Sequence, residues 1–389
     1  MKRRMQSDYY DYNLIAVIII LIGFGLVMLY STTSYTASVR YGDDMYFFTK
    51  QLRNCVLAIL LAVAISLFDY HLLWRLSQAV YGLSIFCMIL VRFVGSSSHG
   101  SQRWLRIGSI QFQPAEMAKI AVIVYLPMLI VSMGKSYRKT IRGPLIVGGL
   151  GLVQAAAAYF LTDNLSTAII IAIISFVIVF VAHPRTAGFL LAVGVLFGIA
   201  ALYVFYVAAG GGSGSFRDQR ILVWLHPENY ARSGGWQILQ GLYALGSGGI
   251  FGKGLGNSTQ KLGALPEAQN DMIFSIICEE LGVVGGVIIV LLFIYLLYRL
   301  FFIAQNAPDL YGSLMVSGVF AHIAAQVILN ICVALNLIPT TGVTLPFVSY
   351  GGTSVLFLMM EMAIALSVSR RIRFRQKERD MWGDLVHTA

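Results

Sequence analysis

The sequence predicts an all-α polytopic membrane protein with about ten transmembrane helices. Of its 389 residues, 58% are hydrophobic and 12% are charged, and the mean hydropathy is +0.75. A soluble domain carries about 25% charged residues, so this composition indicates lipid as the main solvent. Apolar runs extend from the first twenty residues to about residue 368, which predicts a single integral membrane domain over residues 1–389.

The individual spans follow from the length of each apolar run, because a helix needs ~20 mostly apolar residues to cross ~30 Å of hydrocarbon. The first run, from Leu14 to Leu29, is too long for a signal peptide, and no small-residue cleavage site follows it. The predicted spans are residues 13–33, 54–68, 74–94, 114–132, 143–162, 165–182, 186–209, 271–298, 311–335 and 351–369.

The orientation follows from Lys and Arg, which concentrate in short cytoplasmic segments. With the N-terminus inside, the basic residues of the inner segments are Lys2, Arg3, Arg4, Arg75, Lys135, Arg138, Lys139, Arg142, Arg185, Arg299, Arg370, Arg371, Arg373, Arg375, Lys377 and Arg379. We therefore expect residues 1–12 and the basic tail 370–389 to be cytoplasmic.

The net charge of +10 does not indicate nucleic-acid binding, because the basic residues form short clusters at span ends and no nucleic-acid motif is present. The four cysteines, Cys55, Cys87, Cys278 and Cys332, fall inside apolar runs without metal-ligand spacing. We expect neither a disulfide nor a zinc site.

Residues 210–270, between the seventh and eighth spans, form a large outer segment. Loops of this length in compact proteins are functional or disordered. The aromatic residues Trp224, Tyr230, Trp236 and Tyr243 argue against disorder. We expect short interfacial helices on the outer membrane surface.

Ionisable residues within spans are costly and indicate either a structural pair or a functional cavity. Glu116 and Lys119 lie three residues apart on one face of the fourth span, where they either pack helices together or contribute to a site. For Glu279 and Glu280 in the eighth span a structural role is the stronger interpretation, in which one of them caps a helix or pairs with Arg299 or with a neighbouring helix amide. Glu361 lies midway through the tenth span.

Asp271 differs from these residues because it opens the eighth span at the outer water boundary, directly after a polar segment. There a carboxylate stays ionised and can meet a substrate. It can also cap the helix, a contribution of about 1 kcal/mol. The two roles are compatible.

Arg103, Trp104 and Arg106 precede the fourth span at the outer interface. Two Arg residues beside a Trp suit a phosphate head group, although the same residues also serve as an ordinary interface anchor.

The segment from Asn336 to Ser354 contains Pro339, Pro346 and several glycines between two apolar spans. Non-helical backbone at membrane depth is tolerated only where protein buries it or where it lines a watery cavity. A re-entrant or cavity-lining loop is therefore the preferred interpretation over a simple turn.

Together these motifs resemble the shape, elongation, division and sporulation family, which includes RodA, FtsW and SpoVE. The resemblance covers almost the whole chain. The motifs are Arg103-Trp104-Leu-x-x-Gly108, Gln113-Pro114-x-Glu116-x-x-Lys119, Gly249-x-x-Gly252-x-Gly254-Leu255-Gly256, Leu265-Pro266-Glu267-x-x-x-Asp271-x-Ile273-Phe274, Glu279-Glu280-Leu281-Gly282, Asn330, and Pro339-x-x-Gly342-x-x-Leu345-Pro346-Phe347-x-Ser349-Tyr350-Gly351-Gly352.

The resemblance implies ten helices around an outward-opening cavity and a peptidoglycan glycosyltransferase that polymerises lipid II at the outer face of the cytoplasmic membrane. It implies a class B penicillin-binding transpeptidase as partner and a divalent cation, Mg or Mn, as cofactor. Asp271 matches the family's essential aspartate, the expected general base. The expected substrate-binding residues are Arg103, Trp104, Glu116, Lys119, Arg217, Arg220, Lys253, Ser349, Gly351 and Gly352.

The chain departs from the family pattern at one motif. Where the family commonly has Gln-Pro-Asp, this chain has Thr162-Asp163-Asn164, so the acid is displaced by one position. This leaves the role of Asp163 open. Two alternative functions also stay open: a lipid II flippase, since intramembrane charges and broken helices suit transport, and a non-catalytic scaffold for a transpeptidase, in which neutralising Asp271 would be harmless.

Overall fold

The computed structural model describes residues 10–98, 101–107, 110–212, 214–232, 234–263 and 265–373. Within these ranges, nine helices are long and apolar enough to cross a membrane, and a shorter apolar helix, Ser354–Ser369, accompanies them. The prediction of about ten spans is confirmed. Most of the basic residues at both predicted cytoplasmic termini lie outside the described ranges.

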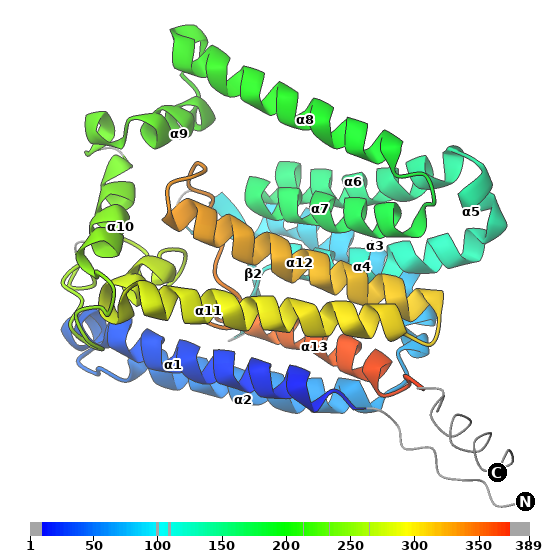
Figure 1. Cartoon of the computed structure of the whole chain (residues 1–389), viewed down its shortest axis with the longest axis horizontal. Coiled ribbons are helices and arrows are strands. Elements are labelled where there is room, and N and C mark those ends of the chain that lie inside the picture. Colours follow the sequence, from blue (N-terminus) through cyan, green and yellow to red (C-terminus); the bar gives the residue numbers. More distant parts are fainter. Residues whose placement is uncertain are drawn as a thin grey trace, which may run out of the picture.

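The helices follow the chain in the order shown in Figure 1. They are α1 Tyr12–Tyr41, α2 Tyr46–Leu67, α3 His71–Val94, α4 Pro114–Met133, α5 Lys135–Lys139, α6 Arg142–Thr162, α7 Leu165–Ala182, α8 Ala187–Tyr206, α9 Phe216–Leu225, α10 Gly235–Ser247, α11 Ile273–Asn306, α12 Leu310–Ala334 and α13 Ser354–Ser369. A π-helical turn, Val207–Gly211, follows α8, and a 3₁₀ turn, Pro227–Tyr230, lies between α9 and α10.

The predicted limits of several spans were wrong. The first span continues to Tyr41, and the second begins at Tyr46 instead of residue 54. Asn54 of α2 is accommodated because its side chain donates to the carbonyl of Gly352 at 3.0 Å. The eighth span begins at Ile273, so Asp271 precedes the helix instead of opening it.

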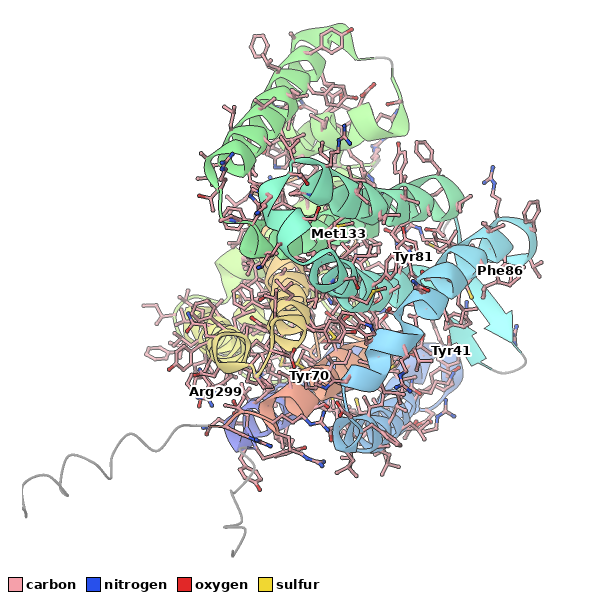
Figure 2. All side chains as sticks on the ribbon, turned by 90° about the vertical axis from the view of Figure 1, so that its right-hand side faces the viewer. Tyr41, Tyr70, Tyr81, Phe86, Met133 and Arg299 are labelled. Atoms are coloured by element: carbon pink, nitrogen blue, oxygen red, sulfur yellow. The ribbon has the colours of Figure 1, made fainter. Side chains whose placement is uncertain are left out.

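The N-terminal end of α1 and the C-terminal end of α13 lie at one end of the bundle (Figure 1). Short helices α9 and α10 and residues 248–270 gather at the opposite end, here called the loop end. Figure 2 looks onto the other end, where Arg299 and Tyr70 are labelled. The arrangement of the chain ends agrees with an even number of spans, and the predicted cytoplasmic position of both termini stays a prediction.

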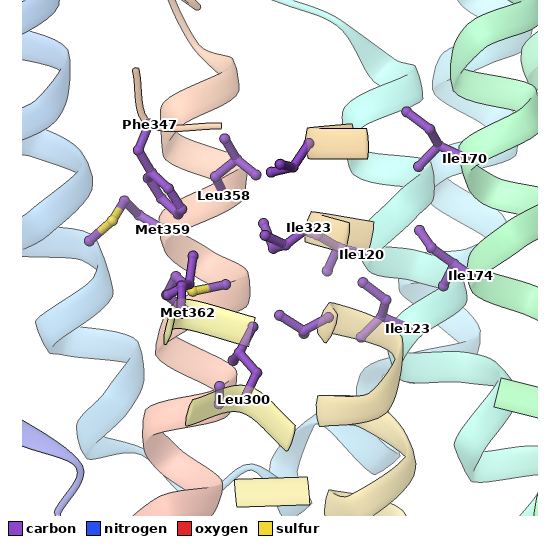
Figure 3. Close-up of a cluster of buried hydrophobic side chains, with 14 of the residues drawn as sticks. Ile120, Ile123, Ile170, Ile174, Leu300, Ile323, Phe347, Leu358, Met359 and Met362 are labelled. Atoms are coloured by element: carbon purple, nitrogen blue, oxygen red, sulfur yellow. The ribbon is translucent and has the colours of Figure 1, made fainter. Parts of the chain in front are cut away.

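The core lies where α4, α7, α11, α12 and α13 meet. Helix α12 packs against α4, α7, α11 and α13. Figure 3 shows the buried side chains at this junction, which come from five helices and the segment before α13: Ile120, Ile123, Ile170, Ile174, Leu300, Ile323, Phe347, Leu358, Met359 and Met362. A well-packed junction of this kind fixes the loops that its helices carry at the loop end.

Helix α8 is the exception, since none of its residues is buried. It runs along one side of the bundle (Figure 1) and contacts α7 near its first turn, where the ring centroids of Phe189 and Phe176 are 6.0 Å apart. Its sequence is nevertheless strongly apolar, and the span is long enough to cross a membrane. Its large exposed side chains, including Leu191 and Phe197, suit contact with lipid hydrocarbon.

A small antiparallel sheet precedes α4, and the sequence did not predict it. Its strands are β1 Ser96–Ser98, β2 Ser101–Ile107 and β3 Ile110–Phe112, in the order β1-β2-β3. Leu105 of β2 pairs with Phe112 of β3. The sheet places Arg103 and Trp104 on a strand, where successive side chains leave opposite faces.

Helix α11 is broken at Gly282, whose φ of 69° and ψ of −168° suit only glycine. Residues 248–262, here called the glycine-rich loop, insert into this break. The amides of Val283 and Val284 donate to the carbonyls of Gly249 and Ile250, at 3.0 and 3.2 Å. The loop backbone thus satisfies amides that an unbroken helix would bond internally.

The loop also donates to the last carbonyls before the break. The amides of Lys253 and Gly254 donate to the carbonyls of Glu279 and Glu280, at 3.0 and 2.9 Å. The approach is so close that a Cβ on Gly252 would lie 2.2 Å from the Glu280 carbonyl oxygen. Glycine is therefore required both in the glycine-rich loop, at Gly252, and in α11, at Gly282.

We predict that Gly282→Ala destabilises the protein. Its positive φ alone costs about 1–3 kcal/mol in a non-glycine residue. In addition, a Cβ there would lie 2.3 Å from the Ile250 carbonyl oxygen. Thermal unfolding of the purified protein in detergent should show a lower midpoint.

The matched control is Gly149→Ala in α6, where an added Cβ meets nothing within 4 Å. Alanine has a better helix propensity than glycine by about 1 kcal/mol, so this variant should unfold at or above the wild-type temperature. Equal midpoints for Gly282→Ala and wild type would contradict the inserted-loop account.

Candidate functional site

Asp271 lies at the loop end, two residues before α11, and its side chain is buried with 7% of the residue exposed. Asn330 of α12 fixes the backbone at this point. Its side-chain amide donates to the carbonyls of Asp271 and Val343, both at 2.8 Å. One buried side chain therefore joins the Asp271 segment to residues 335–353, here called the proline loop.

The Asp271 carboxylate is held by Gln237 of α10, whose Nε2 lies 3.3 Å from Oδ1 and 3.4 Å from Oδ2. The pKa of Asp271 is raised to about 7, chiefly because the carboxyl group is buried and also because the negative charge of Glu267 lies nearby. The hydrogen bond from Gln237 and the positive charge of Arg220 oppose this rise. The result is a carboxyl group that titrates near neutral pH.

Two arginines from other segments lie in the electrostatic neighbourhood of Asp271. Arg220 of α9 interacts with the Asp271 charge, and Arg103 of β2 interacts with Arg220. Burial lowers the pKa of both guanidinium groups, and the proximity of Arg220 lowers that of Arg103 further. Two partly desolvated cations close together favour an anionic ligand.

Backbone carbonyls orient both arginines. Arg103 Nη2 donates to the carbonyl of Asp163 at 2.9 Å, and Arg220 Nη1 donates to that of Thr340 at 3.3 Å. The Asp163 carboxylate also interacts favourably with the Arg103 charge. Asp163 itself ends α6 with a φ of 48°, whereas Asn164 accepts from the Thr167 amide and caps α7. The displaced acid of this motif thus contributes to the position of Arg103.

Helix α9 carries Arg220 because its start is well capped. Ser215 and Asp218 form a reciprocal capping box, and Asp218 also accepts from the hydroxyl of Tyr203 at 2.6 Å. At the other end of α9, Trp224 Nε1 donates to the carbonyl of Asn336 at 3.0 Å. Arg217 also belongs to α9, but its side chain lies outside the described part of the chain.

Glu116 and Lys119 form the ion pair that their spacing predicts, with Lys119 Nζ 2.8 Å from Glu116 Oε1. Both residues are buried in the first turns of α4. Trp104 lies half-buried in β2. The substrate-binding roles of these three residues stay predictions.

The prediction that Glu279 or Glu280 pairs with Arg299 was wrong. Glu279 pairs with Lys253 and Glu280 with Lys261, each at 2.7 Å, both lysines belonging to the glycine-rich loop. Arg299 instead pairs with Asp11 at 2.7 Å. Arg299 lies too far along α11 to reach the carboxylates beside the break.

This pairing bears on Lys253, which was expected to bind substrate. Its ammonium group is neutralised by Glu279 and is only 29% exposed. Glu280 is fully buried, where it also accepts from the hydroxyl of Ser31 at 2.7 Å. Both ion pairs therefore anchor the glycine-rich loop to α11, and a substrate contact by Lys253 stays a prediction.

The proline loop is non-helical and packs against the Asp271 segment, as its composition predicted. Ser349 accepts from the Leu345 amide at 2.8 Å and donates to the Asn270 carbonyl at 2.6 Å. The Tyr350 amide donates to the Gln269 carbonyl at 2.9 Å. The Ser349 hydroxyl is thus already engaged within the protein, while Gly351 and Gly352 follow it with intermediate exposure.

Three residues near the site were not singled out for a role from the sequence: Gln237, Lys261 and the quoted motif residue Asn330. The sequence did contain a signal for Asn330, because the polar residues His322, Gln326 and Asn330 recur every four residues and so share one face of a helix. In the structure all three are buried. His322 pairs with Glu361 at 2.7 Å. Polar side-chain pairs between different helices therefore occur along the bundle as well as at the loop end.

The described residues also bear on whether the protein itself can hold a metal ion. Within the described ranges, no group of three or more His, Cys, Asp and Glu side chains is placed to hold a metal ion.

A cavity of about 730 Å³ lies between α1, α2 and the glycine-rich loop, and its lining includes Tyr30, Phe48 and Lys261 but not Asp271.

The fold and site define a multi-pass membrane protein with a buried acidic residue and two arginines at one end of its helix bundle. A family model described as cell cycle protein, covering FtsW, RodA and SpoVE, matches residues 12–373. The chain belongs to this family, whose roles lie in cell division and sporulation.

Relatives extend over nearly the whole chain. Stage V sporulation protein E of Bacillus subtilis (strain 168) is 38% identical over 368 residues, covering 94% of this chain and 98% of that protein. A protein named probable peptidoglycan glycosyltransferase FtsW from the same organism is 33% identical over 391 residues, covering 97% of this chain and 94% of the relative.

Solved structures share the fold. A chain from a peptidoglycan synthase complex that coordinates polymerization and crosslinking has a TM-score of 0.74 and 27% identity, with 93% of this chain and 98% of that chain covered. The rod shape determining protein RodA of Thermus thermophilus has a TM-score of 0.68 and 26% identity, with 94% and 98% covered.

We predict that Lys261→Met strongly destabilises the protein, because it leaves Glu280 as an uncompensated buried charge. Breaking a buried pair in this way costs about 3–5 kcal/mol. Thermal unfolding in detergent measures the effect, and Lys253→Met should cost less because Lys253 is more exposed.

The double variant Lys261→Met/Glu280→Gln should recover part of the lost stability, since it removes the stranded charge. If Lys261→Met unfolded at the wild-type temperature, the ion pair would not anchor the loop.

Proposed function

We propose that this protein is a glycosyltransferase that polymerises lipid II into glycan strands at the outer face of the cytoplasmic membrane. The observation that carries the proposal is the neighbourhood of Asp271, a buried carboxyl group with a pKa of about 7 near two partly desolvated arginines. Membership of a family whose relatives bear the name peptidoglycan glycosyltransferase supports it.

The reaction needs a base for the acceptor. A sugar hydroxyl of one lipid II molecule attacks the anomeric carbon of another chain, with inversion, and the diphosphate-lipid leaves. Asp271 takes the proton of the attacking hydroxyl. A pKa near the working pH suits this role, because general-base efficiency is greatest when the base is mostly ionised yet still basic.

The leaving group needs positive charge. Arg220 interacts with the charge of Asp271, and Arg103, from a different segment, interacts with Arg220. Guanidinium groups present planar forks of N–H donors that match phosphate oxygens. The two arginines bind the diphosphate and stabilise the charge that develops on it as the glycosidic bond breaks.

Further groups contribute to substrate binding in this proposal. Trp104 on β2 contacts the lipid II head group, and Lys119, although paired with Glu116, adds positive potential at the start of α4. Gly351 and Gly352 leave room beside the site because they have no side chains. A substrate contact by Arg217, whose side chain lies outside the described part of the chain, stays a prediction.

The described residues do not by themselves fit a resident divalent cation, because they offer no cluster of three acidic, histidine or cysteine ligands. Mg²⁺ is commonly held by few carboxylates together with substrate phosphates. The expected Mg or Mn is accordingly proposed to arrive with the diphosphate, and no step is assigned to it. Chelation during the polymerisation assay tests this expectation.

The proposed partner is a class B penicillin-binding transpeptidase, which would crosslink the strands as they form. The likeness to a chain from a complex that coordinates polymerization and crosslinking supports this assignment. The apolar surface of α8, where no residue is buried, leaves room for a membrane-anchored partner.

The flippase alternative is less well supported. The polar pairs along the bundle, Asp11 with Arg299 and His322 with Glu361, each join side chains of different elements at 2.7 Å. Such pairs favour helix packing over a continuous polar path. A non-catalytic scaffold does not require a carboxyl group with a raised pKa, so the scaffold alternative does not account for Asp271.

We predict that Asp271→Asn lowers polymerisation by at least about 100-fold, because general-base catalysis contributes about 10²- to 10⁴-fold. The asparagine keeps the size of the side chain, so folding and lipid II binding should persist. The measurement is gel separation of glycan strands made from labelled lipid II by purified protein, with and without a class B penicillin-binding protein.

Binding of labelled lipid II and the thermal unfolding midpoint are the controls for that variant. Substantial polymer from Asp271→Asn would refute the base assignment. No polymer from wild type, with the partner and with Mg or Mn present, would refute the polymerase proposal and favour a flippase test.

We also predict a pH dependence. The base must be ionised, and the pKa of Asp271 is raised to about 7. Polymerisation should therefore rise from about pH 6 to about pH 8 and fall as the carboxylate is protonated at lower pH. A rate that is flat across this range would contradict the assignment of Asp271 as the titrating base.

A further inference from the structure

We propose that Gln237 is a positioning residue for this reaction, whose side-chain amide orients the Asp271 carboxylate and stabilises its ionised form. The inference rests on the proposed function and adds to it a residue outside the motifs that predicted the site. Gln237 does not act on the substrate itself. It acts through the carboxylate that it contacts.

The contact geometry supports this role. Gln237 Nε2 lies at nearly equal distances, 3.3 and 3.4 Å, from the two oxygens of Asp271. An ionised carboxylate has about four acceptor positions, so one bridging N–H group leaves the remaining lone pairs available for an incoming hydroxyl. The donor is also neutral, so it holds the carboxylate without forming an ion pair that would greatly reduce its basicity.

The position of Gln237 is itself built into the fold. Helix α10 packs against α11, and one turn after Gln237 the chain has Gly241. A Cβ at Gly241 would lie 3.4 Å from the Ser275 hydroxyl oxygen and 3.5 Å from the Met272 sulfur. Even an added Cβ would thus make only ordinary van der Waals contact, which shows that α10 packs closely on the start of α11 at the turn beside Gln237.

The backbone of Asp271 is held independently. Asn330 donates to its carbonyl at 2.8 Å, and the adjoining Asn270 carbonyl accepts from Ser349 at 2.6 Å. With the main chain fixed from the side of α12 and the proline loop, the remaining freedom of Asp271 is rotation of its side chain. Gln237 restricts that rotation from the side of α10.

The charged groups that face Asp271 come from its own segment and from α9. Glu267 raises the pKa of Asp271, and Arg220 lowers it, with Arg103 of β2 next to Arg220. The hydrogen bond from Gln237 also lowers it. Gln237 and Glu267 therefore have opposite effects on the same carboxyl group, and this opposition makes the role testable.

The test compares Gln237→Ala with Glu267→Gln in the lipid II polymerisation assay over a range of pH. Loss of Gln237 removes a donor that favours the ionised form of Asp271. The fall of kcat/KM at low pH, here called the acidic limb, should therefore move to higher pH. Loss of the Glu267 charge should move the limb to lower pH. At neutral pH, Gln237→Ala should be about 10- to 100-fold slower, as expected for a hydrogen bond to a charged group, and should recover partly at higher pH.

Tyr243→Ala is the matched control, because Tyr243 lies on the same helix and is 56% exposed. It should leave both the rate and the acidic limb unchanged. A Gln237→Ala variant that is slower by the same factor at every pH would show that Gln237 merely ties α10 to α11, and would overturn the proposal. So would a variant with wild-type activity.

An infrared titration provides a measurement that does not depend on turnover. The band of the protonated Asp271 carboxyl group is identified by its loss in Asp271→Asn, and its titration midpoint should be higher in Gln237→Ala than in wild type. An unchanged midpoint overturns the inference even if polymerisation is confirmed. A shifted midpoint in a protein that makes no polymer would retain the contact between Gln237 and Asp271 while refuting the proposed function.

Discussion

The structure depends on the insertion of the glycine-rich loop into the break of α11. A span interrupted at Gly282 leaves backbone amides and carbonyls without helical partners, and hydrocarbon offers none. The loop supplies these partners through its own backbone, and it can approach closely enough only because Gly252 and Gly282 lack side chains. Two lysines of the same loop neutralise the two buried glutamates beside the break.

The site at the loop end is assembled from segments that are distant in sequence. Asn330 joins the Asp271 segment to the proline loop, Ser349 ties that loop back to Asn270, and Trp224 joins α9 to the same loop. Backbone is therefore fixed around Asp271 before any ligand arrives. Fixed dipoles and charges around a buried carboxylate are the arrangement by which proteins shift a pKa toward neutrality without a large conformational cost.

Family membership explains why motif residues with no helical pattern of their own lie together in space. The Glu-Glu-Leu-Gly motif supplies the break and its charges, the glycine-rich motif fills the break, and the motif that ends in Ser349-Tyr350-Gly351-Gly352 packs against the Asp271 segment. The departure at Asp163 is accommodated because its contribution comes largely from a backbone carbonyl that orients Arg103, and Asn164 caps the following helix.

The sequence by itself determined the class of protein, the approximate spans, the non-helical loops and the exceptional position of Asp271. Hydrophobicity, span length and the presence of proline or glycine are local properties, as is the spacing that predicted the Glu116–Lys119 pair. Only the tertiary structure decided the partners of the remaining charges, because Arg299 meets Asp11 and Lys261 meets Glu280 across different elements. The sequence also gave no sign of Gln237 beside Asp271, since that contact requires α10 to dock on α11. Partner choice for a buried polar group depends on which helix faces pack together, and helical periodicity does not specify that packing.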